Sequence, residues 1–230
     1  MIDDEDLTCR RKSASALLDS AQASEYVERF LTSEDAYLRR LAVSSKGATH
    51  EHRTLGIRDK NQSVCEAALQ SMNELNEPLD SEDLLMLMDQ GITGPSLIHS
   101  VMESDGEALV KFAMAAKGPT MKKFVKALKE RCDSPEDRLI KTLRDAQEWI
   151  VVGRWLQGLR GEEHDALRWE LIRNPNVDQI ERSRWIERLI GRCDEPILIE
   201  EARRFMNEDH PDLLLQAAQN LSTAYDKLDL

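Results

Sequence analysis

The chain carries one twelve-residue string twice, and this repetition limits the folds that are open to it. Residues 38–49 read LRRLAVSSKGAT, and residues 109–120 read LVKFAMAAKGPT. Apolar residues fall at the same steps of both copies, and a Lys-Gly pair follows them in each copy. The pattern predicts a helix with one apolar face, a stop, and the start of a second helix. A helical unit that is used more than once is typical of chains whose helices stack on their neighbours instead of surrounding one pocket.

Composition and periodicity predict an all-α protein. Aromatic residues make up only 5% of the 230 residues, and no run of alternating β-branched residues predicts a strand. Ser33 or Asp35 can cap the helix that carries Leu38 to Val43. The string Ser134-Pro-Glu-Asp137 predicts the start of the longest helix, which we expect to run to about residue 158. The other expected helices cover roughly 7–32 (as one helix or two), 49–58, 62–74, a short stretch from Ser81, 96–103, 106–116, 120–131, 163–173, 177–191, 196–207 and 211–225.

A second recurring pattern begins with aspartate. Asp59-Lys-Asn-x-x-Val-x-x-Ala67 is similar to the strings that begin at Asp194 and Asp209. Together with RNPNVDQI at 173–180 and SKGATHEH at 45–52, these strings resemble HEAT-like repeats and, more closely, leucine-rich-variant repeats. The resemblance extends over most of residues 33–225. It implies an α-solenoid of short antiparallel helices in a right-handed superhelical stack, which binds a partner along an extended surface and performs no chemistry.

The same resemblance indicates how the chain is divided and what it holds. We expect N-terminal capping helices in residues 1–32, helical repeats in 33–131, and further helical repeats in 132–230 that end in a capping helix, the last two forming either separate domains or one continuous domain. Some leucine-rich-variant proteins hold an iron–sulfur cluster with closely spaced N-terminal cysteines. Only Cys9 lies in that region here, so no cluster or other cofactor is expected.

Charge is distributed unevenly along the chain, whose formal net charge is −12. Residues 61–110 contain ten Asp or Glu and no Lys or Arg, whereas residues 111–131 contain seven Lys or Arg and one Glu. An acidic lobe can attract a basic partner by long-range steering. The alternative is a solvated surface whose lobes partly neutralise each other. The residues of the acidic stretch that we expect to contact a partner are Glu74, Glu77, Asp80, Glu82, Asp83 and Asp89.

A cationic ridge follows the acidic stretch. Met121, Phe124, Val125 and Leu128 form a helical stripe that is apolar. The remaining faces carry the lysines of this segment, which we also expect to contact a partner: Lys122, Lys123, Lys126 and Lys129.

All four tryptophans lie between residues 149 and 185, and three of them follow an arginine. An arginine–tryptophan row can form a binding hot spot or hold stacked bases. Alternatively, tryptophan fills the core between helices while arginine reaches water. On the first interpretation the contact residues are Arg154, Arg168 and Arg184.

No motif predicts catalysis or a metal site. The chain lacks a glycine-rich phosphate loop, a GxSxG string and an HExxH string. His50 and His52 lie two positions apart, so on a helix they point to different faces. The titratable cluster at 162–165 lies at an expected helix start, where acidic residues are common. The four cysteines are widely spaced and are interpreted as reduced thiols. We therefore expect no catalytic residue, no metal and no cofactor.

These patterns favour a non-enzymatic α-solenoid that binds another protein with a basic surface, as an adaptor, scaffold or inhibitor. One alternative is an acidic inhibitor that imitates nucleic acid, a role that suits small acidic proteins, including those carried by viruses of bacteria. A second alternative is an enzyme of the HEAT-like alkylpurine DNA glycosylase type. The charge balance argues against nucleic acid binding, since residues 111–204 carry 20 Lys or Arg against 17 acids. No membrane segment or secretory signal is recognised, so a cytoplasmic location is expected, and pairing of helix ends leaves a homodimer open.

Overall fold

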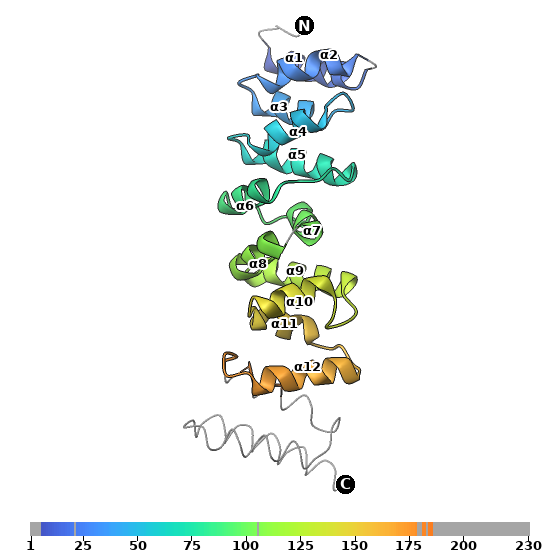
Figure 1. Ribbon diagram of the computed structural model, residues 1–230. Coiled ribbons are helices and arrows are strands. Elements are labelled where there is room, and N and C mark those ends of the chain that lie inside the picture. Colours follow the sequence, from blue (N-terminus) through green and yellow to red (C-terminus); the bar gives the residue numbers. More distant parts are fainter. Residues whose placement is uncertain (1–5, 21, 105, 179–180, 183, 186–230) are drawn as a thin grey trace, which may run out of the picture. The chain divides into compact units, whose positions relative to one another are not determined.

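The computed structural model describes residues 6–20, 22–104, 106–178, 181–182 and 184–185, which form helices and connecting turns without a strand (Figure 1). The predicted all-α class is therefore confirmed for this part of the chain. The helices predicted at 177–191, 196–207 and 211–225 lie wholly or mostly outside the described residues. The described helices are α1 (Leu7–Leu18), α2 (Ala23–Leu31), α3 (Ala36–Val43), α4 (His50–Ile57), α5 (Gln62–Glu74), α6 (Ser81–Asp89), α7 (Pro95–Glu103), α8 (Gly106–Ala115), α9 (Gly118–Arg131), α10 (Arg138–Asp145), α11 (Trp149–Leu156) and α12 (Glu162–Arg173).

Side-chain caps fix where several of these helices begin. Asp6, Asp35, Asn61 and Asp137 each accept a hydrogen bond from a backbone N–H in the first turn of the helix that follows. Thr49 does the same for α4, where the His52 side chain accepts from the Thr49 N–H in return. Such caps satisfy N–H groups that have no partner inside the helix. The expected cap at Asp35 is confirmed.

Both copies of the repeated string form the predicted helix, stop and second helix. Leu38 and Leu109 are buried on the first helix of their copies, as are Ala42 and Ala113. The second helix begins at different steps of the two copies, because Thr49 caps α4 from outside whereas Thr120 already lies within α9. The local pattern is thus repeated, while its exact helix boundary is set by the turn around each glycine.

The long helix predicted from Ser134 to about residue 158 is wrong. The structure has two helices there, α10 and α11, and Asp137 instead of Ser134 caps the first of them. Gln147 adopts a left-handed conformation with φ of 61°, and the Glu148 and Gln147 N–H groups donate to the Leu143 and Arg144 carbonyls. This is the hydrogen-bond pattern of a Schellman motif, which ends a helix. Glycine is the usual residue at that position, so a glutamine there gives no signal in the sequence.

The chain divides into two compact units, Met1–Ala127 and Leu128–Leu230. In the first unit, helices α1 to α5 pack on their neighbours in chain order and also on the helix beyond: α1 contacts α2 and α3, and α3 contacts α4 and α5. The same relation holds for α6 with α7 and α8. In the second unit α10 packs on α11, and α11 packs on α12. Packing between near neighbours is the local arrangement that a repeated helical unit predicts.

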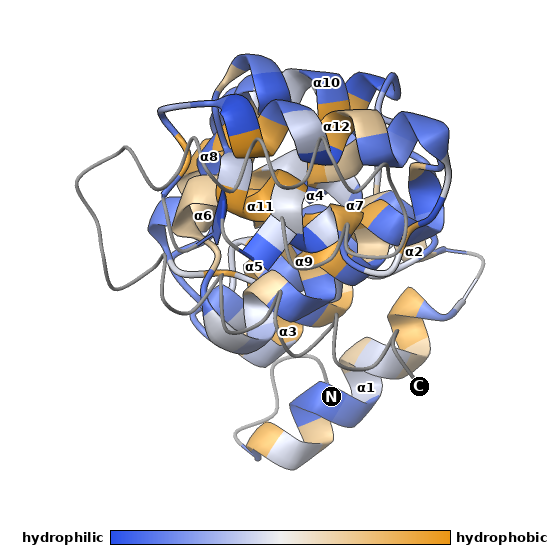
Figure 2. Ribbon diagram, turned by 90° about the horizontal axis from the view of Figure 1, so that it is seen from below, coloured by the Kyte–Doolittle hydropathy of each residue, from blue (hydrophilic) through white to orange (hydrophobic). Residues whose placement is uncertain are grey.

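Each described helix buries apolar side chains. Figure 2 shows that α10 and α12 carry both polar and apolar residues. One cluster of the first unit joins α1, α2 and α3 through Leu18, Phe30 and Leu38. The predicted apolar stripe of α9 is confirmed, because Met121, Phe124, Val125 and Leu128 are all buried. Phe124 packs on Phe112 of α8 with ring centroids 5.0 Å apart.

Candidate functional site

The acidic stretch separates into carboxylates that face water and carboxylates that hold the fold together. Of the ten acidic residues between 61 and 110, Asp105 lies outside the described residues. Glu77 and Asp83 have side chains that are only 19% and 5% exposed. The remaining seven are exposed: Glu66, Glu74, Asp80, Glu82, Asp89, Glu103 and Glu107.

Glu77 is held by two side chains of α4. Arg53 donates from Nε and Nη2 to the two carboxylate oxygens at 2.8 and 2.5 Å, and His50 Nδ1 lies 3.2 Å from Oε2. The hydrogen bonds from Arg53 are the main cause of a lowered pKa of the Glu77 carboxyl. Arg53 is itself buried, and Glu77 is the partner that compensates its buried charge.

Asp83 is held in the same way from the end of α4. Arg58 donates from Nε and Nη2 to its two oxygens, at 2.7 and 3.1 Å. A carboxylate that is this well buried and doubly bonded is not available to a partner. We therefore leave Asp83 out of the proposed contact surface, and Glu77 belongs to it only through the groove described below.

The pair of Arg58 and Asp83 belongs to a series that joins successive parts of the first unit. Asp35, Asp59 and Asp83 recur at intervals of 24 residues, and each accepts two hydrogen bonds from an arginine earlier in the chain. Arg11 bonds Asp35 and Arg39 bonds Asp59. Asp35 and Asp59 stand just before the start of a helix, and Asp83 lies in the first turn of α6, so every pair connects the beginning of a helix to the preceding helices.

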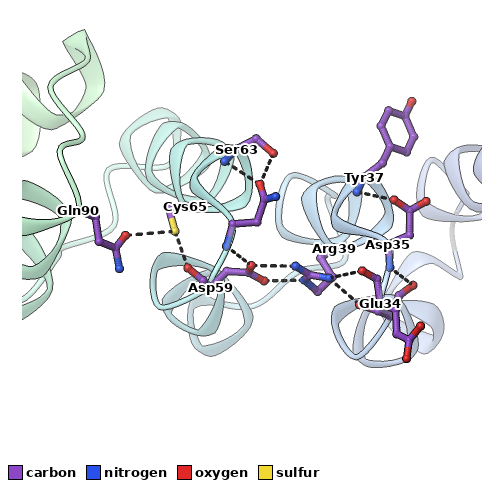
Figure 3. Close-up of polar contacts among 10 residues, drawn as sticks. Glu34, Asp35, Tyr37, Arg39, Asp59, Ser63, Cys65 and Gln90 are labelled. Atoms are coloured by element: carbon purple, nitrogen blue, oxygen red, sulfur yellow. Dashed lines mark hydrogen bonds and ion pairs between the residues drawn. The ribbon is translucent and has the colours of Figure 1, made fainter.

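Arg39 is the most enclosed arginine of the series, and Figure 3 shows its polar contacts. Its Nε and Nη2 donate to Asp59 at 2.7 and 3.0 Å, and its Nη1 donates to the carbonyls of Ser33 and Glu34 at 2.7 and 2.9 Å. Asp59 also accepts from the Asn61 N–H. Although burial opposes ionisation of Asp59, these hydrogen bonds leave its pKa below the usual value. One guanidinium thus ties the turn before α3 to the turn before α5.

A groove of about 420 Å³ lies beside Glu77 in the first unit. One wall is formed by the end of α5 and the turn that follows it, and the other by the last two turns of α7. The residues that line it include no lysine or arginine: Asn73, Asn76, Glu77, Pro78, Leu79, His99, Ser100, Glu103 and Ser104.

The predicted cationic ridge faces water for most of its length. Lys122, Lys123 and Lys126 are exposed on α9. Lys129 is half-buried and donates to the Gln157 carbonyl at 2.6 Å, so it helps to hold the second unit together. Three of the four lysines are therefore placed where a partner can reach them.

The arginine–tryptophan pairs do not form one exposed row. Trp155 and Trp185 are buried, and Trp155 Nε1 donates to the Cys132 carbonyl. Arg168 is only 2% exposed and donates to the carbonyls of Leu156 and Leu159. A buried guanidinium cannot contact a partner, so Arg168 is also left out of the proposed surface.

The remaining members of these pairs lie at the surface. Arg154 and Arg184 are exposed, and Arg184 bonds Glu181 at 2.5 Å. Trp169 is half-buried, with Arg173 lying 5.1 Å from its ring centroid. The core interpretation is thus confirmed for Trp155 and Trp185, whereas Arg154 and Arg184 remain candidates for contact.

The described histidines and the two buried cysteines have structural partners, whereas Cys9 is exposed. Among the described residues, no group of three or more His, Cys, Asp or Glu could hold a metal ion. Burial, aided by a hydrogen bond to Asp137, raises the pKa of the Cys132 thiol to about 12. The Cys65 thiol is also buried, which raises its pKa, and it donates to the Asp59 carbonyl. Cys132 thus stays a protonated thiol at neutral pH. Cys193 lies outside the described residues.

The series of ion pairs and the groove were not predicted from the sequence. A signal for the series does exist, since three aspartates recur every 24 residues and arginines precede them by 20 to 25. The spacing is hidden because many other charged residues lie between them. The groove has no such signal, because its two walls come from helices that α6 separates in the chain.

These features define the described chain as an all-α protein whose first unit is joined by arginine–carboxylate pairs. Comparisons of the chain with protein-family models, with curated proteins and with solved structures find no match. No helix in the described ranges is both long enough and apolar enough to cross a membrane.

Proposed function

We propose that this chain is a helical-repeat protein without enzymatic activity that binds a partner protein through its acidic stretch. The observation that carries the proposal is the exposure of Glu74, Asp80, Glu82 and Asp89 within fifty residues that contain no lysine or arginine. Exposed negative charge is available to attract a basic surface, and Asp89 stays 70% exposed although it also pairs with Lys111 at 3.3 Å.

The packing of the helices supports the repeat architecture that this function needs. Helices α1 to α5 contact their nearest and next-nearest neighbours, as do α6, α7 and α8, and the aspartates of the arginine–aspartate pairs recur with a spacing of 24 residues. We infer that the units belong to a right-handed α-solenoid of the HEAT-like or leucine-rich-variant kind, which presents rows of side chains on rigid helices.

The experiment is capture of partners from an extract of the source organism on the immobilised protein. The test variant carries Glu74→Gln, Asp80→Asn, Glu82→Gln and Asp89→Asn, which spares the paired Glu77 and Asp83. Its matched control removes four exposed carboxylates elsewhere: Asp19→Asn, Glu25→Gln, Glu34→Gln and Asp145→Asn.

We expect the wild type and the control variant to retain the same basic protein, and the test variant to lose it. Retention should weaken with rising salt for the wild type and depend less on salt for the test variant. Equal retention by all three proteins would contradict the proposal. Addition of duplex DNA tests the alternative function. Displacement of the partner by DNA would indicate an inhibitor that imitates nucleic acid.

A further inference from the structure

The groove beside Glu77 is large enough to hold one long side chain. It is a concave volume of about 420 Å³, open to solvent and enclosed by α5, the turn that follows α5, and α7. The turn is held in place by the left-handed Asn76 with φ of 54° and by the hydrogen bonds from Arg53 to Glu77. The groove is thus built from ordered elements.

Two helix ends give the groove a negative potential. α5 ends at Glu74 and α7 ends at Glu103, and residues from the last turns of both helices line the groove. The carbonyl end of a helix carries about half a negative charge, which favours a cation near it. Two such helix ends beside one cavity therefore both favour a cation in it.

The carboxylates add to this potential. Glu103 lines the groove from α7 and is exposed, while Glu77 lines it from the opposite wall. Arg53 balances part of the charge of Glu77, and the two carboxylates and the two helix ends together make the groove attractive to a cation. No lysine or arginine lines the groove.

The groove also has an apolar part. Pro78 and Leu79 line it between the polar groups. A ligand that suits both parts has an aliphatic stem for the apolar surface and a cationic end for the carboxylate and the helix ends. Lysine and arginine side chains have this construction.

We propose that this groove receives a lysine or arginine side chain of the partner protein. The proposal rests on the proposed function, since it names where and by which group the partner is held. The cation lies against Glu103 and the ends of α5 and α7, and its stem lies along Pro78 and Leu79.

The direct test is an NMR titration of the full chain with three small probes. N-acetyl-lysinamide and N-acetyl-argininamide carry the cationic end, and N-acetyl-norleucinamide has a comparable aliphatic stem without charge. We expect the two cationic probes to shift the amide signals of Asn76, Leu79 and Ser104, and the neutral probe to leave them unchanged. Shifts of these signals by the neutral probe, or their absence with the cationic probes, would overturn the proposal.

A pair of variants separates this groove from general attraction to an acidic surface. Glu103→Gln removes one negative charge at the groove, and Glu66→Gln removes one exposed charge on α5, outside its lining. We expect Glu103→Gln to weaken binding of the cationic probes about tenfold, because a charge-assisted hydrogen bond is lost, and Glu66→Gln to leave it unchanged. An equal effect of both variants would show diffuse attraction to the acidic surface and would contradict the proposed site in the groove.

Capture of the partner distinguishes failure of this inference from failure of the proposed function. If Glu103→Gln retains the partner while the fourfold acidic variant loses it, the protein binds its partner by the acidic stretch and the groove is not used. If the cationic probes bind in the groove but no partner is captured, the groove stands as a cation site and the proposed function fails. Melting temperatures of all variants verify that they are folded.

Discussion

The glycines of the two Lys-Gly pairs occupy positions of different physical character. A Cβ atom added at Gly47 would lie 2.5 Å from the Ser24 nitrogen and 2.7 Å from the Ala23 carbonyl carbon. Both contacts are with backbone at the start of α2, which cannot move aside like a side chain. Gly118 has open space around it, but its φ of 53° lies in the left-handed region. The first glycine allows close packing, and the second allows a turn.

We predict that Gly47→Ala destabilises the protein more than Gly118→Ala does. The left-handed backbone of Gly118 should cost alanine about 1 kcal/mol. The steric conflict at Gly47 forces the start of α2 away from the turn, and overpacking of this kind costs roughly 1–3 kcal/mol or more. Urea unfolding followed by circular dichroism measures both changes. A larger loss for Gly118→Ala would contradict the assignment of the two roles.

At the scale of the elements, the arginine–carboxylate pairs decide how one helix start is placed against the helices before it. Arg39 and Asp59 have side chains that are 7% and 12% exposed, so neither charge is well hydrated. A buried pair adds little net stability relative to apolar packing, but removal of one partner leaves the other charge uncompensated. The pairs therefore act mainly by making other placements of the helices unfavourable.

We predict that Asp59→Asn lowers the free energy of unfolding by about 3 kcal/mol, since Arg39 keeps its charge and loses its anionic partner. The amide oxygen of asparagine can still accept from the Asn61 N–H, so the start of α5 is preserved. Glu66→Gln on the exposed face of α5 is the control and should change stability by less than about 0.5 kcal/mol. Chemical unfolding of the two variants gives the comparison, and equal stabilities would contradict the role of the pair.

For the whole molecule, the same carboxylates make stability depend on pH. Hydrogen bonds from Arg11 and Arg53 lower the pKa values of Asp35 and Glu77 in the folded chain, and the pKa of Asp59 is lowered as well despite its burial. A carboxylate with a lowered folded pKa stabilises the fold above its unfolded pKa and loses that contribution as the pH falls through the folded value. Burial raises the pKa of Glu148, so the contribution of this carboxyl to stability changes with pH in the opposite direction.

We predict that the melting temperature is nearly constant between pH 7 and about pH 5 and falls below about pH 4.5, where unfolded Asp and Glu begin to bind protons. Three of these carboxyl groups have a lowered pKa and one has a raised pKa, so together they make the fold less stable as the pH falls. Thermal unfolding monitored by circular dichroism across this pH range tests the prediction. Asp59→Asn should show a shallower fall, because it lacks one of the titrating groups, and an unchanged melting temperature down to pH 3 would contradict the argument.

Most of the helix positions could be predicted from the sequence, because helix formation depends on local signals. The apolar stripe of α9 and the caps before α3 and α4 use residues within a few positions of one another. The prediction of one helix between Ser134 and residue 158 failed where a local signal is absent, since a glutamine takes the left-handed position that glycine usually holds.

The candidate contact residues could be predicted only in part, because charge is visible in a sequence and burial is not. Asp80 and Asp83 lie three positions apart in the same acidic string, yet the first is exposed and the second is almost fully buried against Arg58. Arg168 was expected at the surface like Arg154, but it donates to carbonyls in the interior.

The sequence by itself determined that this chain is helical, where most of its helices begin and end, and where its negative charge is concentrated. These properties follow from residues that are close together in the chain. Only the tertiary structure decided which charges pair with one another, which arginines are buried, and that α5 and α7 enclose a groove. Most of those properties depend on residues 20 or more positions apart, whose meeting is set by how the helices pack.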